Sequence, residues 1–228
     1  MLKVVIFDFD GVLINSEPLM RFAFEKCYGE VFGSGVAPTE SYLEHMGESF
    51  PHIMDHLGLP HTLWEPYKRI CQENADLITP FPEARALLEE LQSTMKLSLL
   101  TGKDRLRTLQ TLERFNLDQY FSLVVASDQL THPKPHPEGI FRTMDALGVE
   151  PSQCVMIGDS VSDVLCAQQA GVTSIAVTWG IKPERVQTLC KPDHIIHDWR
   201  ALRLLLNDLG WKTAASAPMV QQTGATTG

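Results

Sequence analysis

The chain has 228 residues, a formal net charge of −9, 44% hydrophobic and 21% charged residues, as is usual for a globular protein. The acidic balance argues against non-specific nucleic-acid binding, which needs a basic surface. No apolar run approaches membrane-spanning length, and the first is too short for a signal peptide. The five cysteines lack CxxC spacing, so we expect reduced, mostly buried thiols in a cytoplasmic protein.

Six apolar, β-prone runs predict the strands of one sheet. Because they are nearly continuous in apolar residues and alternate with helical patterns, they indicate a parallel sheet with helices on both faces. The fold class is therefore α/β. The runs are Leu2–Phe9, Leu97–Leu100, Leu123–Ala126, Cys154–Ile157, Ser174–Val177 and the weaker Ile195–Ile196.

Four stretches carry apolar residues at helical spacing, and we interpret each stripe as a face packed in the core. The stripes are Ala84, Leu87, Leu88 and Leu91; Leu106, Leu109, Leu112 and Phe115; Ile140, Met144 and Leu147; and Leu202, Leu205, Leu206 and Leu209.

Residues 15–81 show no clear strand and predict an all-helical cap domain inserted into a core domain formed by residues 1–14 and 82–210. Its expected helices are Glu17–Tyr28, Glu40–His45, Ser49–Leu57 and Thr62–Ile78. The insert begins beside the first strand, so we expect it to cover a site there. The alternative is a subdomain that only adds stability. Residues 211–228 have almost no charge and no periodicity, and we expect a disordered tail.

The first strand ends in Asp8-Phe9-Asp10-Gly11, the most informative segment of the chain. Residues at i and i+2 of a strand point to the same side, and two nearby carboxylates need a compensating cation or proton. Ligands of open α/β sheets bind at the carboxyl ends of the strands. The pair therefore indicates a metal, and we expect Mg²⁺, which takes oxygen ligands. An ordinary Asp-Gly turn is the alternative.

Three later strands also end in polar residues. Thr101-Gly102 follows the second strand, Lys134 lies in a proline-rich loop after the third, and Asp159 and Asp163 follow the fourth. Each has a plain structural alternative: a turn, a rigid loop and a helix cap, respectively. Together they supply carboxylates for a metal, and a hydroxyl and a cation for phosphate oxygens.

These motifs, in this order, resemble the haloacid dehalogenase-like superfamily, in its phosphatase branch with a helical cap after the first strand. The resemblance covers about residues 1 to 210 and implies a Rossmann-like three-layer core. The motifs that carry it are Asp8-Phe9-Asp10-Gly11-Val12, Thr101-Gly102, Lys134-Pro135, and Gly158-Asp159-Ser160 with Asp163.

The resemblance implies a Mg²⁺-dependent phosphatase that forms an aspartyl-phosphate. Asp8 would be the nucleophile, and Asp10 the acid and then the base. Thr101, Gly102 and Lys134 would hold the phosphoryl oxygens. The metal would be bound by Asp8, the Asp10 carbonyl and Asp159, with Asp163 as a direct or water-bridged partner.

Other activities within the resemblance remain as alternatives. Asp10 argues against a dehalogenase, which has no leaving oxygen to protonate. Met20 replaces a histidine of phosphosugar mutases, and Gly47-Glu48-Ser49-Phe50 lacks their arginine. Phosphoglycolate phosphatases are close relatives, and the cap segment from Met46 to Pro60 is similar to phosphatases of aminohydroxybenzoate-type secondary metabolism. A catalytically weak binding or regulatory module is the rival from another class.

Smaller signals concern substrate and metal binding. Met46, Phe50 and Met54 are candidates to line an apolar pocket over a cyclic substrate, although cap core is an equal alternative. His52 and His56 have the i, i+4 spacing of zinc ligands but no evident third ligand, so solvated side chains are favoured. His132 and His136 flank Lys134, where a loop role is favoured. We expect a small phosphorylated substrate, no nucleic-acid or membrane partner, and a monomer or weak dimer.

Overall fold

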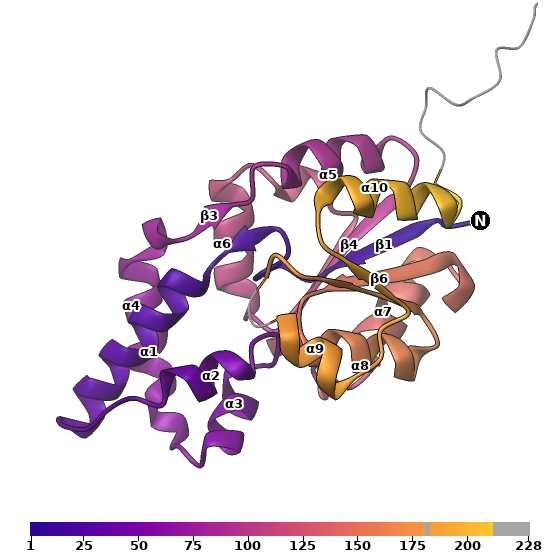
Figure 1. Ribbon diagram of the computed structural model, residues 1–228. Helices are drawn as coiled ribbons and strands as arrows, with labels where there is room; N and C mark the ends of the chain where they lie inside the picture. The colour runs from indigo at the N-terminus through magenta and orange to yellow at the C-terminus, as the bar shows by residue number, and fades with distance from the viewer. Residues whose placement is uncertain (181–182, 212–228) are drawn as a thin grey trace, which may run out of the picture.

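The computed structural model describes residues 1–180 and 183–211. It contains one six-stranded parallel sheet in the order β5-β4-β1-β6-β7-β8, with helices on both faces (Figure 1). The predicted α/β fold is confirmed. The strands are β1 Val4–Phe7, β4 Lys96–Thr101, β5 Leu123–Ala126, β6 Cys154–Gly158, β7 Thr173–Val177 and β8 His194–Ile196.

The two faces of the sheet form separate apolar cores because side chains alternate along each strand. Val5 and Phe7 of β1 belong to one core, together with residues of α5, α6 and α10. Val4 and Ile6 belong to the other, with residues of α7 and α8. These helices are α5 Ala84–Gln92, α6 Arg105–Arg114, α7 Glu138–Leu147, α8 Val161–Ala170 and α10 Trp199–Asp208. A further helix, α9 Pro183–Leu189, packs beside α8.

Four helices form a group beside the sheet, at the lower left of Figure 1. They are α1 Glu17–Phe32, α2 Thr39–Glu44, α3 Phe50–Leu57 and α4 Trp64–Glu73. Aromatic side chains join them: the Phe24 and Tyr42 rings stack 4.2 Å apart, and the Tyr42 hydroxyl donates to the Tyr67 hydroxyl at 2.7 Å. We call residues 16–78 the helical segment.

The structure corrects the expectation that residues 15–81 hold no strand. Ile14–Asn15 (β2) and Thr79–Pro80 (β3) pair antiparallel at the two ends of the helical segment. The expected helix over 62–78 is also interrupted, because short turns at His61–Leu63 and Ala75–Leu77 flank α4. Such two-residue strands are too short to leave a periodic pattern in the sequence.

The end of the described chain differs from the expected tail. Trp211 is buried, and its indole N–H donates to Thr94 Oγ1 at 3.0 Å. The rest of the predicted tail, 212–228, lies outside the described residues. All five cysteines are free and buried, as expected. Across the described residues, no helix is both long and apolar enough to cross a membrane.

The predicted core stripe of α6 is wrong in part. Leu112 is fully buried, but Leu106 and Leu109 are 58% and 37% exposed. The buried positions beside Leu112 are instead Thr108 and Thr111, whose hydroxyls donate to backbone carbonyls one turn earlier. Hydrogen bonding thus lets polar residues take core-facing positions that a hydrophobicity pattern does not identify.

The different burial of Leu112 and Leu106 allows a matched test of stability within one helix. Leu112→Ala should lower the free energy of unfolding by about 2–5 kcal/mol, because it removes fully buried methyl groups and leaves a cavity. Leu106→Ala should change it by less than about 0.5 kcal/mol, since Leu106 is mostly exposed. Urea denaturation of both variants would measure this, and equal losses would contradict the assigned orientation of α6.

Candidate active site

Asp8 lies just past the carboxyl end of β1, beside other buried charged side chains. Its amide N–H donates to the Ile157 carbonyl at 2.9 Å, which extends the pairing of β1 with β6. The side chain is 1% exposed. Lys134 Nζ forms ion pairs with Asp8 Oδ1 at 2.9 Å and with Asp163 Oδ1 at 2.6 Å. One buried lysine therefore bridges two buried carboxylates.

Lys134 is delivered by the loop before α7, where the Lys134–Pro135 peptide bond is cis. Burial alone would lower the pKa of the Lys134 ammonium, but the charges of Asp163 and Asp8 raise it well above its usual range. The lysine is therefore charged at physiological pH. Its 1% exposure means that it balances carboxylate charge inside the protein and not at the surface.

Asp163 is held by several contacts in the first turn of α8. Its Oδ2 accepts hydrogen bonds from the Ser160 N–H at 3.1 Å and from Ser160 Oγ at 2.6 Å, while Oδ1 accepts from Lys134. Both oxygens thus fix neighbouring groups. This is the capping geometry that the sequence offered as the plain alternative, and it also orients Lys134.

The Asp8 carboxylate is incompletely satisfied. Apart from the ion pair of Oδ1 with Lys134, neither Oδ atom has a hydrogen-bond partner among the described residues. Burial and the neighbouring Asp163 raise the pKa of Asp8 to about 7, against the opposing effect of Lys134. A buried acceptor without a partner is costly, so the site favours either a proton or a cation at Asp8.

A divalent cation fits this place. One oxygen each of Asp8, Asp159 and Asp163 lie within 4.8 Å of one another, and all three residues are buried. Carboxylate oxygens are the ligands that Mg²⁺ prefers. The Asp10 carboxylate is not a member of this group.

Glycines shape the space around Asp159. A Cβ at Gly11 would lie 2.0 Å from Asp159 Oδ2, and one at Gly180 would lie 2.2 Å from the same oxygen. Gly11 also has a φ of +78°, which disfavours other residues there. The glycine after Asp10 is therefore needed both for the turn and for close approach of Asp159.

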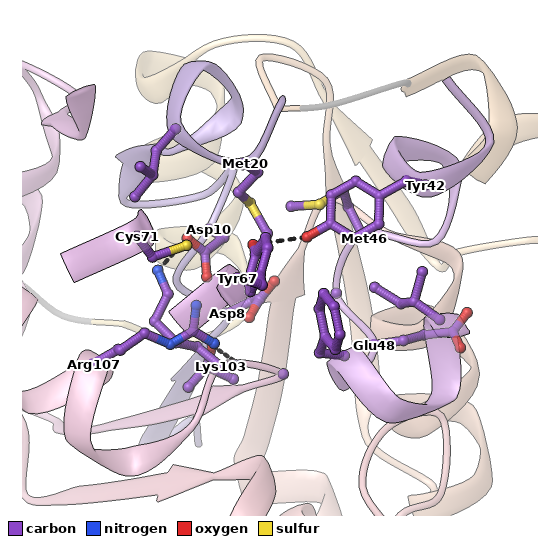
Figure 2. Close-up of a pocket in the computed structure, with 16 residues that line it drawn as sticks. Asp8, Asp10, Met20, Tyr42, Met46, Glu48, Tyr67, Cys71, Lys103 and Arg107 are labelled. Carbon is purple, nitrogen blue, oxygen red and sulfur yellow. Dashed lines mark hydrogen bonds and ion pairs between the residues drawn. The ribbon is translucent and has the colours of Figure 1, made fainter. Parts of the chain in front are cut away.

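Asp10 belongs to a second buried ion pair, at the floor of a cavity. Lys103 Nζ donates to Asp10 Oδ1 at 2.7 Å, and both side chains are less than a tenth exposed. The Lys103 amide N–H also donates to Thr101 Oγ1 at 3.1 Å. Figure 2 shows Asp8, Asp10 and Lys103 beside the same cavity. Thr101 and Gly102 also line it.

The helical segment supplies the opposite wall. The cavity is narrow: the space between its walls is about 490 Å³ including open solvent, but a water-sized molecule can centre itself in only about 30 Å³ of it. Met20, Tyr42 and Tyr67 face it (Figure 2). Met46 and Phe50 line it too, as the sequence suggested, whereas Met54 is core and is not part of the lining.

The two walls approach each other closely at Gly102. A Cβ there would lie 2.5 Å from the Glu48 carbonyl oxygen and 2.6 Å from that of Gly47. A Cβ at Gly47 would in turn lie 2.3 Å from Ser160 Oγ. Both glycines are thus required for the loop of residues 46–49 to rest on the strand ends.

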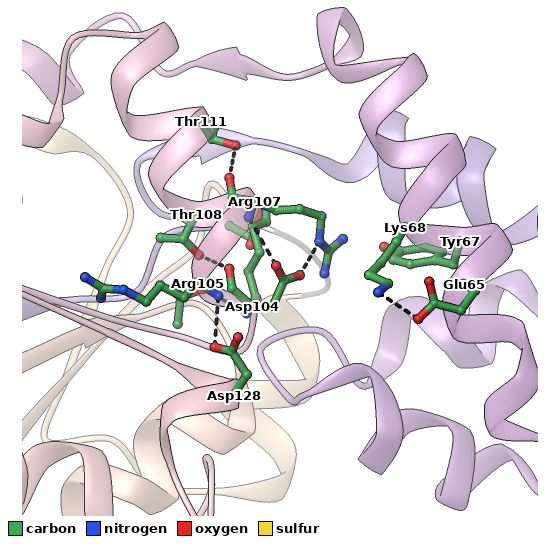
Figure 3. A network of polar contacts seen from close by, with 12 residues as sticks. Glu65, Tyr67, Lys68, Asp104, Arg105, Arg107, Thr108, Thr111 and Asp128 are labelled. Atoms are coloured by element: carbon green, nitrogen blue, oxygen red, sulfur yellow. Dashed lines mark hydrogen bonds and ion pairs between the residues drawn. The ribbon is translucent and has the colours of Figure 1, made fainter.

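Sequence reasoning missed two cations of the cavity, Lys103 and Arg107. Arg107 pairs with Asp104 and lies over the rings of Trp64 and Tyr67, at 5.0 and 5.4 Å; Figure 3 shows Arg107 between Asp104 and Tyr67. Lys103 directly follows the Thr101-Gly102 motif, which is a usable signal. No sequence signal identifies Arg107, because its role depends on packing against the helical segment.

His52 and His56, for which the sequence favoured solvated side chains over a zinc site, do not form a pair of metal ligands among the described residues. His52 does not join His56; instead His45 and Glu48 do. His132, His136 and Glu138 lie together in the Lys134 loop.

The comparisons with known proteins agree with this geometry. The family model "Haloacid dehalogenase-like hydrolase" matches residues 5–177. The chain belongs to this family. Pyrophosphatase PpaX of Oceanobacillus iheyensis is 29% identical over 91% of this chain and 98% of its own length. A phosphoglycolate phosphatase of Pseudomonas savastanoi pv. phaseolicola is 29% identical over 88% and 78%, respectively.

A solved structure shows the same fold. The putative haloacid dehalogenase-like hydrolase from Bacteroides fragilis superposes with a TM-score of 0.81 at 24% identity, covering 89% of this chain and all of that one.

The buried lysine gives a sharp stability prediction. Lys134→Met should lower the free energy of unfolding by about 3–5 kcal/mol, because it leaves Asp8 and Asp163 buried without their counter-charge. Lys191→Met, at an exposed lysine, should cost less than about 0.5 kcal/mol. Chemical denaturation without divalent ions would test this. Equal stability of the two variants would contradict the bridging role of Lys134.

The raised pKa of Asp8 predicts how metal and pH act together. Below the unfolded pKa of about 3.8 the folded state has the full benefit of a protonated Asp8, and this is lost as pH rises towards 7. Mg²⁺ and the proton should compete for this carboxylate. The rise in melting temperature caused by millimolar Mg²⁺ should therefore be larger at pH 8 than at pH 6.

Differential scanning fluorimetry measures this rise against NaCl at equal ionic strength. In Asp8→Asn, which keeps the shape but removes the charge, the pH-dependent part should disappear. A rise that is equal at both pH values, or unchanged in Asp8→Asn, would contradict a metal site at Asp8.

Proposed function

We propose that this protein is a Mg²⁺-dependent phosphatase that hydrolyses a small phosphorylated metabolite through an aspartyl-phosphate. The observation that carries the proposal is the buried Asp8 carboxylate, which lines the cavity and has no polar partner among the described residues beyond its ion pair with Lys134. The phosphatase names of the relatives support it. Bound Mg²⁺ would be held by Asp8, Asp159 and the Asp10 carbonyl, with Asp163 as a direct or water-bridged partner, and would neutralise charge on the phosphoryl oxygens.

In the first step, an Asp8 oxygen attacks phosphorus and the bond to the leaving oxygen breaks. The departing oxygen takes a proton from the Asp10 carboxyl group, so that an alcohol leaves. The Thr101 hydroxyl, the Gly102 amide and the Lys134 ammonium would receive the transferring oxygens, since Lys134 pairs with Asp8 and Thr101 and Gly102 line the same cavity as Asp8. Their contribution is charge stabilisation of the transition state.

In the second step, Asp10 removes a proton from water, and the resulting hydroxide attacks phosphorus and releases Asp8. The ion pair with Lys103, at 2.7 Å, fixes the Asp10 side chain where it faces the cavity. Lys103 is thus proposed to position the acid–base group. Burial under the helical segment limits competing reactions with solvent.

The cavity wall indicates the size and character of the leaving group. Apolar and aromatic side chains face Asp10 from the helical segment, and Lys103 and Arg107 lie at one side. We propose a small leaving group with an apolar or ring-shaped face, as in secondary metabolism. We propose that residues 15–81, which include the helical segment, form a cap domain that covers the active site. We propose that the protein acts in the cytoplasm as a monomer or weak dimer.

Two alternatives are weaker. A phosphosugar mutase would need groups to rebind an intermediate, and Met20 and Phe50 present apolar atoms to the cavity where such groups would be required. Phosphoglycolate is a candidate substrate because a relative carries that name. A carboxylate beside the phosphate could pair with Lys103 or Arg107.

The proposal is tested by phosphate release from a panel containing phosphoglycolate, pyrophosphate, sugar phosphates and aryl phosphates. Release should require Mg²⁺, stop on chelation, and fall by more than about 10³-fold in Asp8→Asn, because the nucleophile is lost. Asp10→Asn should also lose turnover while keeping the Mg²⁺-induced rise in melting temperature, since only its carbonyl would touch the metal.

An exposed carboxylate on the helical segment supplies the control: Asp55→Asn should retain wild-type rates. Equal release by Asp8→Asn and wild type would exclude the mechanism. No release from any compound by folded, Mg²⁺-binding protein would favour the binding or regulatory module.

A further inference from the structure

A second cluster of metal-ligating side chains lies on the helical segment, separate from the buried carboxylates. His45 follows the last residue of α2, Glu48 lies in the loop of residues 46–49, and His56 is in the last turn of α3. His45 Nδ1 lies 3.1 Å from Glu48 Oε1, and His56 Nε2 lies 3.1 Å from Glu48 Oε2. One carboxylate therefore meets two imidazoles, one just after α2 and one in α3.

The three groups converge on one small volume. Their ligand atoms all lie within 4.8 Å of one another, and the two imidazole rings stack with centroids 4.4 Å apart. Two histidines and one glutamate, with a remaining position for water, form a known ligand set for Zn²⁺. The Glu48 side chain is only 14% exposed, whereas that of His56 is 54% exposed, so an ion can enter from solvent.

We propose that His45, Glu48 and His56 bind a transition-metal ion of the Zn²⁺ type. The proposal does not depend on the phosphatase activity. The sequence offered only the spacing of His52 and His56; the fold replaces His52 by two ligands from the preceding loop. Neutral imidazole nitrogens favour Zn²⁺, Ni²⁺ or Co²⁺ over Mg²⁺, so this site differs in kind from the carboxylate group around Asp8.

The other histidine cluster is less suited to a metal. Both oxygens of Glu138 accept backbone hydrogen bonds, from the N–H groups of Thr131 and His132. His136 Nδ1 likewise accepts from the Glu138 N–H. These atoms stabilise the start of α7, and an ion would have to displace them. In the His45 cluster, each Glu48 oxygen instead faces an imidazole nitrogen.

The position of the cluster gives the ion a structural consequence. Glu48 lines the active-site cavity, and its carbonyl and that of Gly47 rest against Gly102. A bound ion would tie the ends of α2 and α3 to this loop. The loop carries one wall of the cavity, so the ion would hold that wall in place.

Isothermal titration with Zn²⁺ tests the site in the full chain, with excess Mg²⁺ present to occupy the carboxylates. Wild type should bind one Zn²⁺ that His56→Ala binds at least about tenfold more weakly. His52→Ala, on the same helix, and His132→Ala, in the other cluster, should match wild type. Glu48→Gln, which keeps the side-chain shape, should weaken binding as His56→Ala does.

Circular dichroism of each variant separates loss of the site from loss of the fold. The exposed position of His56 makes unfolding of that variant unexpected. Co²⁺ supplies a second readout, because its visible absorption reports a site of low coordination number with nitrogen ligands. Equal Zn²⁺ binding by wild type and a folded His56→Ala, or loss of binding in His132→Ala instead, would overturn the proposal.

Discussion

The structure depends on burying carboxylates of like charge close to one another in the interior. Asp8, at the end of β1, and Asp163, in the first turn of the helix that follows β6, share a single ammonium group, that of Lys134. This arrangement costs stability unless the charges are compensated. It follows from the topology, because β1 and β6 are adjacent and parallel and their carboxyl ends therefore bring the two motifs together. A site with this charge balance is ready for a cation and for an anionic group next to it.

The rest of the molecule isolates this charge from water. Gly11 and Gly180 give Asp159 the space it occupies, and Gly47 and Gly102 let the loop of residues 46–49 reach the strand ends. Arg107 connects α6 to the helical segment through Trp64 and Tyr67, with its charge balanced by Asp104. Aromatic packing and buried ion pairs thus hold the two walls of the cavity together, and the low-dielectric surroundings strengthen each charge inside.

The sequence predicted the fold well because its strands are short, apolar and regularly separated by helices. The four strand-end motifs could be located for the same reason. Contacts made across the cavity could not. Lys103 and Arg107 belong to the site only because the helical segment packs over them, and Leu106 is exposed because hydrogen-bonded threonines take the inner face of α6. The partners of His56 were also hidden, since they depend on how the loop between α2 and α3 folds back.

The most direct test of the account is to trap the covalent intermediate on Asp8. Asp10→Asn protein would be mixed with Mg²⁺ and an activated aryl phosphate, a substrate whose leaving group needs no proton. The reaction would be quenched in acid, and the phosphorylated residue would be mapped by peptide mass spectrometry. The account predicts a phosphoryl group on the peptide containing Asp8, formed faster than it is hydrolysed because the base for water is missing. Aryl-alcohol release that proceeds through many turnovers with no phosphorylated Asp8, or a phosphoryl group on another residue, would contradict it.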